Sequence, residues 1–330
     1  MSRSYPFPLA SGRYEVGPSM RRFGQAGQGF EAEEAHFQPD DRLAETLAAK
    51  LNALRQAPRE CHLFAPGLSP ADEAGLRTAM QQVFRLVAAE HPALVTADEA
   101  GATLHHLGLR LAGWAAPRLE QVGQGLGPVA SEARAWLAGR EGLDLLGSAL
   151  GLAVQEDLAI VRGPSPGKDD MLEWLHVCLP SNWSPAEKIG GSFGTVHEPV
   201  VHSKRLLANQ GQIVRAIIQA GPFVRYVWGI HRDGELCHNP RIHQAPPWEP
   251  DRAVEQAWFR VERQTTHGFP RLNRALFTIR YWVVPLVEVA ADPWQRERLA
   301  TALAGMDEAE LAYKGLVGVR DRLVGWLQKA

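Results

Sequence analysis

An imidazole and a carboxylate stand next to each other at His197-Glu198, near the end of a segment that runs from 171 to 201. Imidazole is a common ligand of transition metals, and a carboxylate pairs with a cation at short range. Pro199 follows, and it is expected to hold this stretch extended. The residue types favour the wall of a binding site. For His197 taken alone, a structural histidine that bonds the turn at Pro199 is the alternative.

A strand is expected to lead into this site. Residues alternate in character from Leu172 to Cys178, which predicts an extended segment with Trp174 and His176 on one face. Pro180 ends the strand.

A short helix is expected between that strand and the histidine. The run Ser184-Pro185-Ala186-Glu187 is typical of a helix start, with Glu187 closing a capping box onto Ser184. Lys188 continues the helix. Gly190 and Gly191 follow within two turns, so the helix must be short.

Two further strands, about 256–265 and 275–287, are predicted to pair as a hairpin. Arg263 shares a face with Phe259 and Val261, and Tyr281 shares a face with apolar residues of the second strand. A guanidinium and a phenol would then project into one apolar space, which favours a pocket for a flat anionic ligand. The alternative is that Arg263 pairs with a core carboxylate such as Glu156.

The rest of the chain gives a coarser picture. Leucine spacing predicts a helix over 41–56 started by Asp40 or Asp41, and Ser69-Pro70 starts a second helix. Thr96-Ala97-Asp98-Glu99 resembles a further capping box, and short helices are expected between 90 and 150. Further predictions are an N-terminal arm across the body (1–38), a helix passing into a strand near Gln155 (145–161), a helix (203–220), a strand (223–230), a loop whose His238 and His243 are surface residues (236–250) and C-terminal helices (293–329).

Composition excludes several classes. The 330 residues carry a formal net charge of −2 without a long run of one sign, which argues against a nucleic-acid-binding surface. Three scattered cysteines are too few for a disulfide framework or an iron–sulfur cluster. No stretch has the length and apolar character of a membrane span or a signal peptide. We therefore expect a cytoplasmic location, and an oligomeric assembly is left open.

Three separated segments resemble one known family, the heme-dependent oxidative N-demethylases, in their heme-binding alpha-subunit type. The resemblance extends from about residue 5 to 290. Its segments are VQEDL at 154–158, LPSNWSPAEKIGGSFGTVHEPV at 179–200 and RVERQTTHGFPRLNRALFTIRYWVVPL at 260–286.

The resemblance implies an α+β fold, with a PAS-like antiparallel β-sheet wrapped by helices that holds heme b. It also implies a monooxygenase that uses O2 to demethylate a small secondary amine and releases formaldehyde. Electrons would come from partner reductase proteins that carry FMN and a 2Fe–2S cluster. The chain would divide into an N-terminal arm and helical region (1–150), the heme-binding core (151–290) and C-terminal helices (291–330).

The resemblance also assigns roles to residues. His197 matches the family's histidine segment and is the expected axial ligand of the heme iron, with His176 as its competitor. Lys188 and Arg263 are expected near the heme propionates. Tyr281 and Glu198 are expected on the distal or amine side. A heme-PAS gas or redox sensor, a heme carrier, or a relative that has lost heme and binds another small molecule are the alternative functions.

Overall fold

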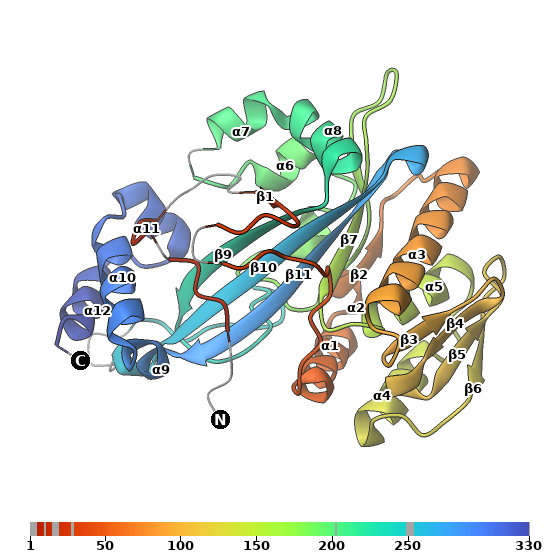
Figure 1. Ribbon diagram of the computed structural model, residues 1–330, viewed down its shortest axis with the longest axis horizontal. Helices are drawn as coiled ribbons and strands as arrows, with labels where there is room; N and C mark the ends of the chain where they lie inside the picture. The colour runs from red at the N-terminus through yellow and green to blue at the C-terminus, as the bar shows by residue number, and fades with distance from the viewer. Residues whose placement is uncertain are drawn as a thin grey trace.

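An antiparallel seven-stranded sheet forms the centre of the molecule (Figure 1). The computed structural model describes residues 5–9, 11–14, 20–27, 30–201, 203–248 and 254–329. In spatial order the strands of this sheet are β1 (Arg21–Arg22), β9 (Phe223–His231), β10 (Trp258–Phe269), β11 (Arg274–Pro285), β7 (Asp157–Arg162), β8 (Met171–His176) and β2 (His62–Phe64). The predicted strands at 171–178, 223–230, 256–265 and 275–287 are confirmed within a few residues.

A second, four-stranded sheet lies beside the first, in a region expected to be helical. Its strands are β3 (Val95–Ala97), β4 (Gly101–Leu104), β5 (Leu109–Ala112) and β6 (Arg118–Gln121). The capping box predicted at Thr96 is wrong. Thr96 lies in β3, and the Asp98 carboxylate instead accepts bonds from the backbone N–H groups of Ala100 and Gly101 in the turn to β4. Local turn chemistry and helix capping use the same side chains, so the short motif could not separate them.

Helices cover both ends of the large sheet. They are α1 (Leu43–Gln56), α2 (Pro58–Cys61), α3 (Pro70–Glu90), α4 (Gly127–Leu137), α5 (Gly142–Leu152), α6 (Phe193–His197), α7 (Lys204–Ala208), α8 (Gln210–Ala220), α9 (Leu286–Ala290), α10 (Pro293–Ala304), α11 (Glu308–Lys314) and α12 (Arg320–Leu327). Single 3-10 turns occur at His105–Leu107, Pro185–Glu187, Val254–Gln256 and Pro270–Leu272. The expected helix over 203–220 is divided into α7 and α8.

Helices α3 and α1 differ in how their N-termini are capped. Ser69 and Asp72 form the expected reciprocal capping box at the start of α3. At α1 the residue before the helix is Arg42, without a side-chain cap, while the Asp40 carboxylate accepts the N–H of Arg42. The expectation that an aspartate caps α1 is therefore wrong.

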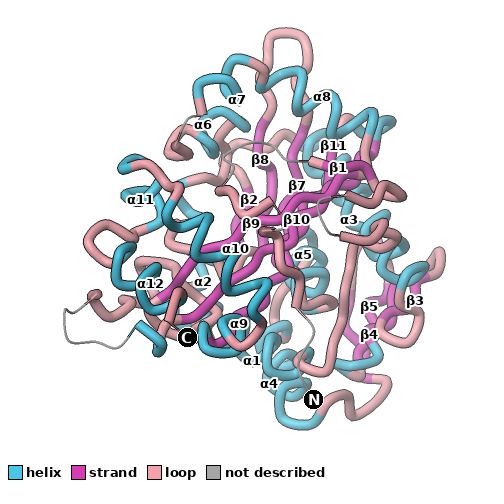
Figure 2. Tube along the Cα trace, turned by 60° about the vertical axis from the view of Figure 1, so that its left-hand side comes forward, coloured by secondary structure: helices cyan, strands magenta, loops and turns pink. Residues whose placement is uncertain are grey.

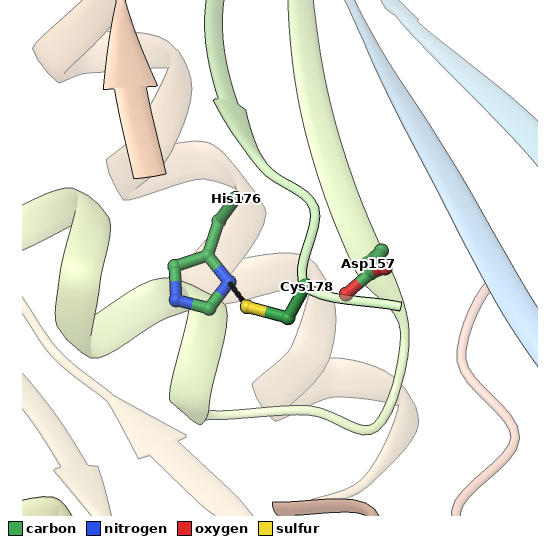
Figure 3. A group of neighbouring side chains, drawn as sticks. All are labelled: Asp157, His176 and Cys178. Carbon is green, nitrogen blue, oxygen red and sulfur yellow. Dashed lines mark hydrogen bonds between the residues drawn. The ribbon is translucent and has the colours of Figure 1, made fainter. Parts of the chain in front are cut away.

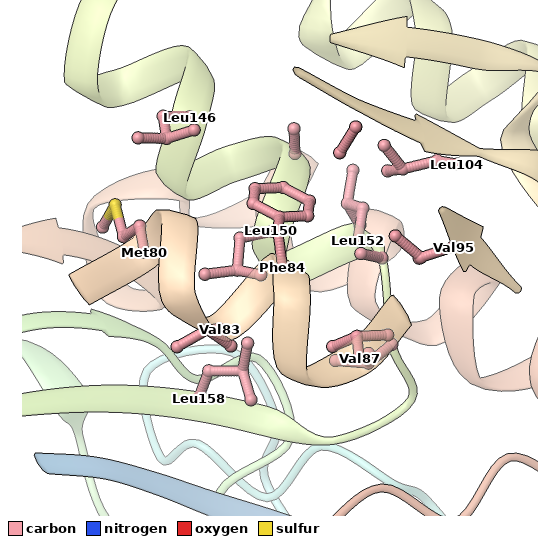
Figure 4. Close-up of a cluster of buried hydrophobic side chains, with 14 of the residues drawn as sticks. Met80, Val83, Phe84, Val87, Val95, Leu104, Leu146, Leu150, Leu152 and Leu158 are labelled. Atoms are coloured by element: carbon pink, nitrogen blue, oxygen red, sulfur yellow. The ribbon is translucent and has the colours of Figure 1, made fainter. Parts of the chain in front are cut away.

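The main core lies where α3 and α5 pack between the two sheets (Figure 4). Phe84 and Val87 of α3 meet Leu150 and Leu152 of α5, and Leu158 reaches them from β7. All five side chains are fully buried. Truncation of Phe84 to alanine is of the kind that costs about 3–5 kcal/mol. This core holds the small sheet against the large one.

A second core attaches the C-terminal helices to the other end of the sheet. The leucines that predicted this helical region, Leu299, Leu303, Leu311, Leu316 and Leu323, pack with Phe259 and Val261 of β10. The described part of the N-terminal arm closes this core, since Leu9 is fully buried in it. Both expectations are confirmed.

The register of the β10–β11 hairpin corrects the expected pocket. Glu262 lies opposite Tyr281, and Arg263 lies opposite Arg280. Because residues directly opposite each other in an antiparallel pair share a face, Arg263 and Tyr281 point to opposite sides of the sheet. The prediction that they project into one space is wrong.

Arg263 holds the N-terminal arm against the sheet. Its guanidinium is fully buried, donates twice to the Glu33 carboxylate, and donates to the carbonyls of Ala35 and His36. The partner predicted for it, Glu156, instead accepts the backbone N–H of Gln38. A buried carboxylate was expected correctly, but it comes from the arm.

Candidate functional site

A cavity of about 400 Å³ opens on one face of the large sheet and lies within the size range of small-molecule and cofactor sites. Strands β7 to β11 form its floor, and α6 and α8 form its cover. Figures 1 and 2 show α6, α7 and α8 grouped together at one end of the sheet, away from the small sheet. The walls are mainly apolar, with Leu175, Val177 and Phe277 on the strand side and Phe193, Val214 and Ile217 on the helix side.

The segment that covers the cavity is more helical than expected. Ser192 caps α6 by accepting the N–H of Thr195, and the Asp170 carboxylate accepts the N–H of Phe193. His197 is therefore the last residue of a helical turn, so the prediction of an extended stretch before Pro199 is wrong. Capping by Ser192 outweighs the preference of the residue before proline.

The helix start predicted at Ser184 is only a 3-10 turn, Pro185–Glu187. The Ser184 hydroxyl donates to the Glu60 carboxylate and accepts no backbone N–H of the turn, so the predicted capping box does not form. This tertiary bond fixes the loop that carries Lys188 to the wall of the cavity.

His197 lines the cavity with one ring nitrogen committed to the protein. Its Nδ1 lies 2.8 Å from the carbonyl oxygen of Phe193, and its ring stacks on the Phe193 ring at 4.1 Å. A carbonyl can only accept, so Nδ1 carries the proton and Nε2 carries the lone pair. Burial, together with the nearby Arg225 guanidinium, lowers the pKa of His197 to about 4. The ring is thus a neutral imidazole at neutral pH.

Four cationic side chains line the same cavity: Lys188, Arg225, Arg260 and Lys314. Arg260 is committed to structure, because it donates to the carbonyls of Leu179 and Leu236 and stacks on the Tyr281 ring. Arg225 donates through Nε to Gln264 at 2.6 Å. For Lys188, no ion pair occurs within the described ranges of the chain. Lys314 donates to the Trp228 carbonyl, so Lys188 and Arg225 are the cations best suited to a bound anion.

Glu262 is the carboxylate that lines this cavity. It is 8 % exposed and accepts hydrogen bonds from Ser181 and from Gln264 at 2.9 Å. Arg260 and Glu262 come from the polar face of β10, on which polar residues alternate with Phe259 and Val261, and Arg225 comes from β9.

Four of the expected site residues, His176 among them, lie elsewhere. Arg263 is on the opposite face of the sheet. Glu198 is an exposed residue at the end of α6 and is not among the described residues that line the cavity. Tyr281 lies on the cavity side of the sheet but is 1 % exposed, and its hydroxyl donates to Asp157 at 3.1 Å. Lys188 and His197 are the two that the structure brings together in the cavity.

His176 is enclosed in the core (Figure 3). Its partner residue in β7 is Leu158, which belongs to the main core, and its ring is fully buried. His176 Nδ1 lies 3.6 Å from Cys178 Sγ, and a Cβ built on Gly151 of α5 would approach the ring to 2.1 Å. Burial holds the pKa of His176 well below its usual value. This packing leaves little room for a large ligand at this ring.

Sequence reasoning missed Arg225, Glu262 and His231. A usable signal was present, since Arg225, Val227, Gly229 and His231 alternate along β9 with Val224, Tyr226, Trp228 and Ile230. The apolar face of β10, which carries Phe259 and Val261, was expected to face the pocket. In fact that face packs on the C-terminal helices, and the polar face lines the cavity.

The sequence profile of the haem-dependent oxidative N-demethylase, alpha subunit-like family matches residues 31–324. The chain belongs to that family. The family name states a dependence on haem, an oxidative demethylation and an alpha subunit of a larger enzyme. Within the described residues, no helix combines the length and the apolar character that crossing a membrane requires.

The cavity fits the group that the family name implies. Heme needs apolar walls, an axial ligand with a free lone pair, and cations for two carboxylates. Apolar side chains, His197 Nε2, and the pair Lys188 and Arg225 supply these three requirements in one space. Neither Arg263 nor His176 is needed to complete the set.

Proposed function

We propose that this chain is the heme-binding oxygenase subunit of an enzyme that demethylates a small secondary amine. The observation that carries the proposal is the imidazole of His197, which faces an apolar cavity with Nε2 unprotonated, in a chain of this family. In the overall reaction one atom of O2 leaves in formaldehyde and the other in water, and NAD(P)H supplies two electrons through partner proteins.

His197 is the proposed axial ligand of heme b. Histidines that ligate a metal almost always donate their other N–H to a carbonyl or carboxylate, which fixes the tautomer and the orientation of the ring. Phe193 provides that carbonyl from the same helical turn. The low pKa of His197 keeps the lone pair available through the physiological range.

Lys188 and Arg225 are the proposed contacts of the heme propionates. When bound, heme would supply the activation of O2. The apolar side chains of β8, α6 and α8 would keep bulk water away from the reacting centre.

Glu262 replaces Glu198 as the proposed contact of the amine. Ser181 and Gln264 donate to it, and Arg260 Nε lies 3.8 Å from Oε1, beyond hydrogen-bond distance, so the carboxylate can still accept a hydrogen bond from a cationic amine.

The proposed fold is PAS-like and the proposed assembly includes reductases. The central strands β8-β7-β11-β10-β9 are antiparallel, and α6 to α8 are inserted between β8 and β9, which supports a PAS-like core. The three cysteines do not suffice for a 2Fe–2S cluster, so FMN and the iron–sulfur centre are assigned to separate proteins. We expect this assembly in the cytoplasm.

Absorption spectroscopy of the chain expressed with an adequate heme supply tests the proposal. A Soret band is expected in the wild type and in His105→Ala, which changes an exposed histidine in another part of the fold. His197→Ala should lose or shift the band. An unchanged band in His197→Ala would mean that another residue is the iron ligand. The absence of a band in the wild type after heme reconstitution would reject the oxygenase function.

Turnover separates the enzyme from its alternatives. Formaldehyde release that requires NAD(P)H, O2, a methylated amine and the reductase partners is expected of the heme-loaded chain. Heme binding without formaldehyde release would favour a gas sensor or a heme carrier.

A further inference from the structure

Two histidines and one carboxylate converge in the loop that follows β9, outside the cavity. His238 Nε2 lies 2.9 Å from Asp233 Oδ1, and His243 Nε2 lies 3.0 Å from Asp233 Oδ2. The three ligand atoms lie within 4.8 Å of one another. His238 was predicted to be a surface residue, but it is 2 % exposed, so that prediction is wrong.

The loop is folded in a way that directs both rings to one point. His238 donates its N–H to the Pro180 carbonyl, and its own carbonyl accepts from Asn182. Asn239 is fully buried and starts a turn in which its carbonyl accepts the N–H groups of Ile242 and His243. This turn brings His243 back beside His238, although four residues separate them.

A small cavity of about 210 Å³ adjoins the cluster and gives it access to solvent. His238, His243 and Asn182 are among its lining residues. A quarter of the His243 side chain and about a fifth of the Asp233 side chain are exposed. The cluster is therefore reached from outside by an ion and by water, unlike the fully enclosed group of Asp157, His176 and Cys178.

We propose that Asp233, His238 and His243 form a binding site for Zn²⁺ or a similar divalent transition metal ion. Two imidazole nitrogens and one carboxylate oxygen are a ligand set that such ions prefer over Mg²⁺ or Ca²⁺. The two imidazole nitrogens lie 2.9 and 3.0 Å from the two carboxylate oxygens, and the three ligand atoms lie within 4.8 Å of one another. Modest side-chain shifts would bring them to the spacing of roughly 3.4 Å that a four-coordinate ion with bonds of about 2.0–2.2 Å requires. Three protein ligands leave one position, which faces the small cavity and is open to water or to an external ligand.

The site lies next to the larger cavity. Asn182 lines both cavities, and the His231 ring, whose centroid is 4.5 Å from that of His238, lines the larger one. A bound ion would crosslink Asp233 at the end of β9 to the loop at 238–243, and so fix one wall beside the larger cavity. The inference rests on this geometry and does not depend on heme.

Metal titration of the full chain without a polyhistidine tag tests the site. After treatment with a chelator and dialysis, Zn²⁺ is added in competition with a colorimetric chelator, and the zinc content is measured by atomic spectroscopy. The wild type should bind one equivalent. His243→Ala and Asp233→Asn should each weaken binding by at least about 100-fold, since loss even of an outer-shell partner weakens metal binding by roughly 10–100-fold.

His105→Ala serves as the matched control and should bind as the wild type does. Co²⁺ should give the visible bands of a four-coordinate ion without a thiolate charge-transfer band, which distinguishes this site from the cysteines. His243 is partly exposed, so His243→Ala is expected to fold even where Asp233→Asn does not. Absence of stoichiometric zinc in the wild type, or equal affinity in folded His243→Ala, would overturn the proposal.

Discussion

Glu262 and Tyr281 are direct partners across the β10–β11 hairpin, but their side chains lie in different environments. Glu262 reaches the cavity, whereas the Tyr281 side chain is enclosed between Arg260 and Asp157. Two residues of one cross-strand pair thus serve ligand binding and core structure respectively. The proposed site therefore ends at Glu262, and Tyr281 belongs to the packed structure behind it.

Tyr281→Phe should lower stability without changing heme binding. The substitution removes the hydroxyl that donates to Asp157, while Leu179 still donates its N–H to the same carboxylate oxygen. A loss of about 1–3 kcal/mol in the free energy of unfolding is expected from a buried acceptor that loses one donor. Urea denaturation measures the loss, and a heme titration followed at the Soret band should be unchanged. Weaker heme binding at unchanged stability would contradict this prediction and would mean that Tyr281 contacts the ligand.

Arg263→Ala should loosen the N-terminal arm. Its removal takes away the close cationic partner of the buried Glu33 carboxylate and leaves it with Arg21 at 4.0 Å, which costs about 3–5 kcal/mol in the free energy of unfolding. Glu33→Ala should cost a similar amount, and the double variant should cost less than the sum of the two. Equilibrium denaturation of the three variants gives these values. An additive double variant would contradict the pairing.

The affinity for heme should be independent of pH until the solution becomes strongly acidic. The pKa of His197 is about 4, so the imidazole lone pair is present above that pH and is lost as the pH falls through it. Below about pH 4 the affinity should decrease by about tenfold per pH unit, since one proton competes with the iron. Soret-band titrations at each pH, with circular dichroism to verify the fold, measure this. A decrease that begins near pH 6.5 would show that the ring is not shielded by burial.

Glu90→Gln should reduce the acid sensitivity of the fold. Burial raises the pKa of Glu90, but the hydrogen bonds from His36 and the N–H of Phe37 outweigh it, so the folded-state pKa lies below its usual value of 4.5. The ionised carboxylate therefore stabilises the fold fully above that usual value, and this contribution is lost as the pH falls through the folded-state pKa.

The glutamine variant should be less stable at neutral pH by about 1–3 kcal/mol and should lose less on acidification than the wild type. Urea denaturation at a neutral and an acidic pH gives both differences. Parallel losses in the two proteins would mean that Glu90 does not carry this part of the pH dependence.

The sequence by itself determined the central strands, the C-terminal helices and the family, but not the four-stranded sheet at 95–121. Alternation identified β8, β9, β10 and β11, the leucine spacing identified the C-terminal helices, and three motifs indicated the demethylase family to which the chain belongs. His197 and Lys188 were found because they lie close together in one motif. Alternation, leucine spacing and short motifs depend only on residues that are close together in the sequence, so the sequence is sufficient to identify them. The division into three segments stays a prediction.

Tertiary structure alone decided which face of each strand meets the ligand. The alternation of a strand predicts that neighbouring side chains point to opposite faces of the sheet. Only strand pairing and packing determine which face is covered by helices and which faces the cavity. A shift of one residue in register would reverse every assignment. Arg263 and Tyr281 were separated, and Glu262 and Arg225 were brought into the cavity, for this reason. Likewise, His238 and His243 meet at Asp233 only because a buried turn at Asn239 folds the loop back, a contact that no spacing in the sequence encodes.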